Sequence, residues 1–60
     1  MNAVTVTKAI EEAERFLAAA REVRAAAKVE PMIFYGSRPT GALRRASMDL
    51  TRAFADLRKP

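Results

Sequence analysis

The first half of the chain is one uninterrupted run of helix-forming residues. Residues 1–30 contain neither glycine nor proline, and they are rich in Ala, Glu, Arg, Lys and Leu, the residue types with the highest helix propensities. Apolar side chains recur there at alternating steps of four and three residues: Val6, Ile10, Ala13, Leu17 and Ala20. The stripe is widened by Ala9, Phe16, Val23 and Ala27. This period is typical of an amphipathic helix. We therefore expect a helix over about residues 5–28, with Thr5 or Thr7 as its N-terminal cap.

A second helix is predicted after a proline. Pro31 ends the first helix, because the residue before a proline avoids the helical region and proline itself lacks the backbone N–H. From about residue 40 to residue 58 apolar side chains again recur at steps of three and four: Leu43, Ala46, Leu50, Ala53 and Leu57. This spacing is typical of the contact seam of a short coiled coil.

The two helices predict an all-α fold, an antiparallel two-helix hairpin that forms a single domain. The connector, about residues 29–39, is longer than the two to eight residues usual between bundle helices. It carries four consecutive large apolar side chains: Met32, Ile33, Phe34 and Tyr35. We expect these four either to cover the core of the hairpin or to form an interaction patch for a partner or a second copy, and the sequence leaves both readings open.

The shortage of large apolar side chains points to self-association. Half of the 60 residues are apolar, but thirteen of these are alanine, which leaves seventeen larger side chains. The chain has no Cys and no His, so neither a disulfide nor a Cys/His metal site can compensate for a small core. We expect a homodimer, packed as a four-helix bundle, with a core and dimer seam formed by Ile10, Leu17, Leu43, Leu50, Phe54 and Leu57.

The residue types that are missing also limit the catalytic and metal-binding chemistry open to the chain. Without His or Cys there is no thiol nucleophile, no imidazole acid or base and no typical zinc site. The carboxylates fall mostly where a solvated helix face would place them, and Lys8 with Glu12 and Glu11 with Arg15 have the spacing of ion pairs along a helix. We expect no enzyme activity, no catalytic residues, no metal and no cofactor.

The positive charge is concentrated in the second half. The net charge is +4, and residues 31–60 carry all of it, since acidic and basic residues balance in residues 1–30. A candidate surface for phosphate groups consists of Arg44, Arg45, Arg52, Arg58 and Lys59. A solvated helix face explains the same pattern, and the four aromatic residues fall at core or seam positions rather than between the basic ones. Nucleic-acid binding is therefore the second hypothesis.

The leading hypothesis is a small helical protein that self-associates and acts by binding a protein partner, as an adaptor, inhibitor or regulator. No apolar run approaches the 18 or more residues of a membrane span. The N-terminal residues lack the basic and apolar regions of a signal peptide. We therefore expect a cytoplasmic location.

Overall fold

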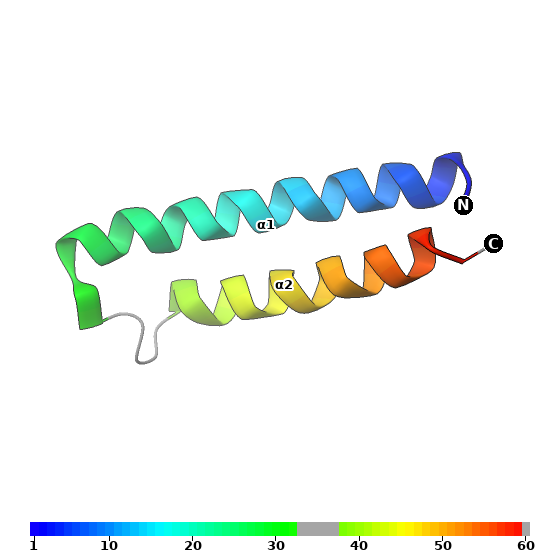
Figure 1. Cartoon of the computed structure of the whole chain (residues 1–60). Helices are drawn as coiled ribbons and strands as arrows, with labels where there is room; N and C mark the ends of the chain where they lie inside the picture. The colour runs from blue at the N-terminus through cyan, green and yellow to red at the C-terminus, as the bar shows by residue number, and fades with distance from the viewer. Residues whose placement is uncertain (33–37, 60) are drawn as a thin grey trace.

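Two helices lie side by side and antiparallel in the computed structural model of the chain (Figure 1). Helix α1 spans Ala3–Val29 and helix α2 spans Arg38–Leu57. The structure describes residues 1–32 and 38–59. The two ends of the chain lie at the same end of the hairpin (Figure 1). There the amino group of Met1 donates a hydrogen bond to the carbonyl of Lys59 at 2.6 Å. The predicted all-α two-helix hairpin is confirmed.

Helix α1 begins earlier than the sequence pattern predicts, and the predicted cap is wrong. Asn2 is the N-cap: its side-chain oxygen accepts a hydrogen bond from the backbone N–H of Thr5 at 2.9 Å. The hydroxyl of Thr5 accepts one in return from the backbone N–H of Asn2 at 3.0 Å. Asparagine is a stronger N-cap than threonine, and Thr5 completes a capping box three residues later. The first turn therefore includes residues 3 and 4, which precede the predicted start of the helix.

Proline residues mark the inner ends of both helices. Helix α1 ends at Val29, just before the pair Glu30 and Pro31, as expected from the restriction that proline places on the preceding residue. Helix α2 begins at Arg38, two residues before the predicted start. Pro39 is its second residue, a position where the missing N–H costs no helical hydrogen bond.

Small side chains form the contact between the helices. The buried apolar residues are Ala9, Val23, Ala46 and Ala53, and no large side chain is fully buried among the residues that the structure describes. Phe16, Leu43, Leu50 and Leu57 are half-buried beside them. Alanine at the contact lets two helix backbones approach closely, but it removes little apolar surface from water. The hairpin therefore has a narrow core and leaves many larger side chains at its surface.

Candidate functional site

A polar groove runs along one side of the contact between the helices. Its volume is about 260 Å³, and it is lined by Lys8, Glu12, Arg15, Asp49, Arg52, Ala53 and Asp56. The first three belong to α1 and the others to α2. Every residue in this lining except Ala53 is charged, so this side of the hairpin, here called the polar groove, is a network of opposite charges.

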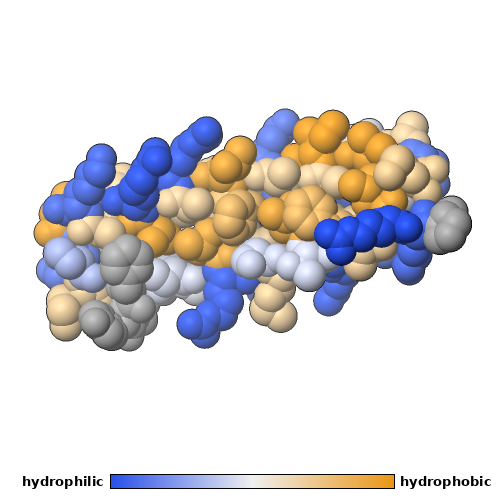
Figure 2. All heavy atoms as spheres, in the orientation of Figure 1, coloured by the Kyte–Doolittle hydropathy of each residue, from blue (hydrophilic) through white to orange (hydrophobic). Residues whose placement is uncertain are grey.

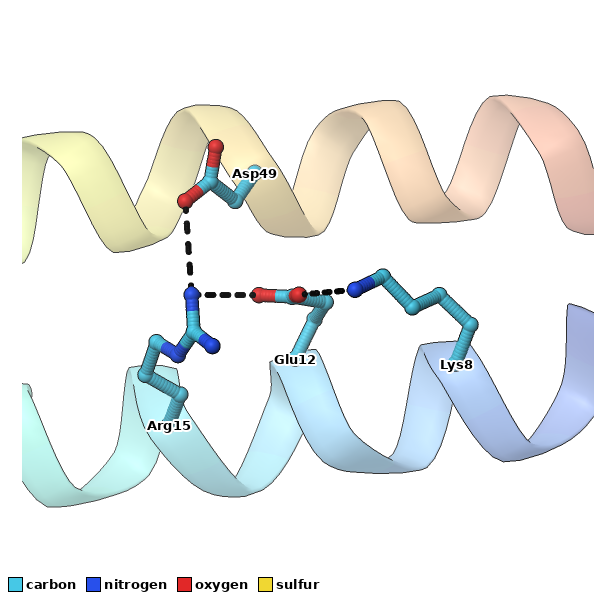
Figure 3. Close-up of polar contacts among 4 residues, drawn as sticks. All are labelled: Lys8, Glu12, Arg15 and Asp49. Carbon is cyan, nitrogen blue, oxygen red and sulfur yellow. Dashed lines mark ion pairs between the residues drawn. The ribbon is translucent and has the colours of Figure 1, made fainter.

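Glu12 lies at the centre of this network (Figure 3). Its Oε1 atom is 3.0 Å from Nζ of Lys8, and its Oε2 atom is 3.5 Å from Nη1 of Arg15. The same guanidinium nitrogen is 3.7 Å from Oδ2 of Asp49 on α2. The predicted pairing of Lys8 with Glu12 is confirmed, whereas Arg15 pairs with Glu12 and Asp49 rather than with Glu11.

Glu12 is only 4% exposed, which is unusual for a charged residue in so small a fold. Its Oε2 atom has a cation nearby but no hydrogen-bond partner within the described part of the chain. Within the same residues, no three acidic side chains are grouped so that they could hold a metal ion. The groove therefore offers charge compensation between the helices.

The opposite side of the hairpin is apolar. On α1, Lys8 and Ile10 flank the buried Ala9, and on α2, Arg52 and Phe54 flank the buried Ala53. Successive side chains on a helix are about 100° apart, so the two residues that flank a buried one point to opposite sides of the contact. Because Lys8 and Arg52 both line the polar groove, Ile10 and Phe54 share the other side.

Four exposed side chains define this second surface, which we call the apolar strip. They are Val6 (39% exposed), Ile10 (52%), Leu17 (46%) and Phe54 (39%). Steps of four and seven residues place the first three on one line of α1. The antiparallel register, which brings Met1 to Lys59 and Arg15 to Asp49, sets Phe54 beside the N-terminal part of that line. Figure 2 shows apolar side chains gathered over the N-terminal half of α1 and the adjoining part of α2.

The structure divides the predicted seam between these two environments. Leu43, Leu50 and Leu57 are half-buried at the contact between the helices, whereas Ile10, Leu17 and Phe54 are exposed. The residues of α1 that face α2 belong to the wider part of the predicted stripe, one position away from its central line. Ala9, Phe16 and Val23, spaced by seven, are the sequence signal for that inner line.

The basic residues of the second hypothesis are all exposed, and their surroundings differ. Arg52 lines the polar groove, while the guanidinium of Arg58 lies over the ring of Phe54, 6.0 Å from its centroid, on the apolar side. Lys59 forms an ion pair with Asp56 at 3.4 Å. Within the described residues, no ion pair engages Arg44 or Arg45. The predicted basic residues thus border both the polar groove and the apolar side, and one of them is paired with Asp56.

Of the predicted connector patch, Met32 is described and is 64% exposed, while Ile33, Phe34 and Tyr35 lie outside the described residues. Comparison with known proteins found no matching family, and no curated protein or solved structure similar to the chain. Neither described helix has the combination of length and hydropathy needed to traverse a membrane.

Proposed function

We propose that this chain is a non-enzymatic helical protein that self-associates through the apolar strip and acts by binding a protein partner. The observation that carries the proposal is the distribution of apolar side chains. The apolar residues buried at the contact between the helices are three alanines and one valine, whereas Val6, Ile10, Leu17 and Phe54 remain exposed. Contiguous exposed apolar surface of this kind is typical of a protein interface.

The exposed area of the chain supports the proposal that a second copy of the chain covers the apolar strip. The chain exposes 4855 Å². A folded monomer of this mass exposes about 3,900 Å² on average, so the hairpin has roughly 1,000 Å² in excess. Each partner in an interface of standard size buries about 800 Å². Two hairpins that face each other across their apolar strips would cover an area of this order and form a four-helix bundle.

Charge favours an antiparallel arrangement of the two α1 helices. The line of Val6, Ile10 and Leu17 continues into basic residues further along α1. A parallel, in-register dimer would set these basic residues against the same residues of the other copy. An antiparallel dimer centred on Ile10, in which residues 3–17 of the two copies face each other, keeps these basic residues apart. It avoids the destabilising contact between like charges.

Sedimentation equilibrium at micromolar concentration tests the proposal. We expect the wild-type chain to have twice the mass of one chain, 6.6 kDa. The double variant Ile10→Glu/Leu17→Glu should lose self-association, since four charges would lie in the dimer interface. Met48→Glu is the matched control, because Met48 is 66% exposed but lies away from the contact seam of α2. Circular dichroism of each variant shows whether the helices persist.

Either of two results would overturn the proposal. One is a folded wild-type chain with the mass of a monomer. The other is a dimer that Ile10→Glu/Leu17→Glu leaves as stable as Met48→Glu does.

Nucleic-acid binding is the second candidate, and the exposed Arg44 and Arg45 favour it. Tight binding of random duplex or single strands at low salt, with affinity that falls steeply as salt rises, would promote this candidate above the first. The absence of binding at low salt would eliminate it. The acidic side chains of Asp49 and Asp56 on the same helix weaken any continuous phosphate contact.

A further inference from the structure

The line of side chains that forms the apolar strip on α1 changes its chemistry after Leu17. From Leu17 the same steps of four and three residues lead to Arg21, Arg24 and Lys28. All three are exposed, and we call them the basic end. In Figure 2, strongly hydrophilic side chains stand over the C-terminal third of α1, beside the apolar region. One line along α1 therefore presents apolar groups over its N-terminal part and cations over its C-terminal part.

The three cations of the basic end have no carboxylate partner in the described part of the chain. All four ion pairs found there involve other basic residues. Stabilisation of the helix dipole accounts for Lys28, which lies in the last turn of α1. Arg21 and Arg24 lie before the last turn, where the dipole effect has fallen off. Their charges are thus available to a group from outside the hairpin.

We infer that the basic end is the docking site for an acidic amphipathic helix of the protein partner, an inference that rests on the proposed function. Lys28 lies seven residues after Arg21, about 10 Å along the helix axis, with Arg24 between them. Acidic residues three and four positions apart on a neighbouring helix repeat over the same distance. Ala20 and Ala27, both half-buried next to these cations, allow a second helix backbone to approach closely.

The surroundings of the basic end favour a protein over a nucleic acid. Glu22 follows Arg21 directly and Glu30 lies close beyond Lys28, so the basic end is a short patch bounded by carboxylates rather than a continuous track for a phosphate backbone. Single-stranded nucleic acids also need aromatic side chains for base stacking. The described aromatic residues are Phe16, which is half-buried, and Phe54 near the far end of the hairpin. An acidic helix needs no base stacking, and it can place small apolar side chains against Ala20 and Ala27.

The antiparallel dimer leaves this site free. In that arrangement the N-terminal parts of the two α1 helices cover each other, and the two basic ends lie at opposite ends of the bundle. The dimer is then bivalent, with one acidic helix at each end.

Fluorescence anisotropy with a defined probe tests the inference on the full chain. The probe is a labelled synthetic helical peptide of Ala, Leu and Glu, with Glu at positions i, i+3 and i+7; the comparison peptide has Gln in place of Glu. We expect the Glu peptide to bind at least ~10-fold more tightly than the Gln peptide at low salt, because charge-assisted hydrogen bonds are the stronger ones. Its affinity should fall as salt rises.

Matched variants locate the site. Arg21→Gln/Arg24→Gln should weaken binding of the Glu peptide by at least ~10-fold, since both charge-assisted contacts are lost. Arg45→Gln/Arg52→Gln removes the same charge from a line of α2 on the polar-groove side and should leave binding nearly unchanged. Sedimentation separates the two proposals: Arg21→Gln/Arg24→Gln should remain dimeric, because the apolar strip is intact. A dimeric wild-type chain without peptide binding refutes this inference alone.

Three other results overturn the inference. The first is equal binding of the Glu and Gln peptides. The second is equal weakening by the two pairs of substitutions, which would show net charge rather than a site. The third is tighter binding of random duplex DNA than of the Glu peptide, with the same dependence on Arg21 and Arg24.

Discussion

Arg15 of α1 reaches across the contact between the helices to Asp49 of α2, with 3.7 Å between Nη1 and Oδ2. Within residues 1–32 and 38–59 it is the one ion pair that joins the two helices. The side chain of Arg15 is 63% exposed, so the pair alone adds little to stability. The ion pair matters for the alignment of the helices, because it joins one turn of α1 to one turn of α2. Glu12, which also pairs with Arg15, is buried next to it.

Replacement of Glu12 by methionine should stabilise the fold. The carboxylate of Glu12 is buried and one of its oxygens lacks a hydrogen bond, whereas its partners Lys8 and Arg15 are exposed and would return to water. Well-packed apolar residues often improve on such a buried charge. We expect the free energy of unfolding in urea to rise by about 1 kcal/mol for Glu12→Met. Glu14→Met at an exposed position is the control and should change it little; a less stable Glu12→Met would contradict the prediction.

The cap at Asn2 should be measurable as a loss of stability. Asn2→Ala removes the side-chain oxygen that accepts the N–H of Thr5, so that N–H loses its partner. We expect the free energy of unfolding to fall by about 1 kcal/mol, as for other N-caps. Asn2→Asp keeps an acceptor at the same place and should retain most of the stability. Thermal unfolding followed by circular dichroism, at one fixed chain concentration, compares the three proteins; equal stability of Asn2→Ala and the wild type would rule out the cap.

The alanine contact should not tolerate a larger side chain. Ala53 is 4% exposed, and leucine there would push the helices apart or force strained rotamers. We expect Ala53→Leu to lower the free energy of unfolding by about 1–3 kcal/mol. Ala55→Leu is the control, since Ala55 is exposed two residues further along α2. A neutral or stabilising Ala53→Leu would mean that the helices are not in close contact at this residue.

The sequence predicts only part of the polar network. The pairing of Lys8 with Glu12 follows from spacing along one helix, and it is present. The choice of Arg15 between Glu11, Glu12 and Asp49 depends on which carboxylates lie near the contact with α2. Residues 11 and 12 point in directions about 100° apart, so only the packing of the helices decides which of them is buried.

Local rules in the sequence determined that this protein is a pair of helices. Residues 1–30 carry no helix breaker, Pro31 ends α1, and the steps of three and four residues set the period of α2. The tertiary structure decided which line of α1 faces α2. The line through Ala9 and Val23 is buried, while the neighbouring line through Ile10 and Leu17 is left outside. Both lines have the same period, so the sequence pattern alone does not separate them. Small side chains buried at the contact let the two helices approach, while Ile10 and Leu17 remain at the surface.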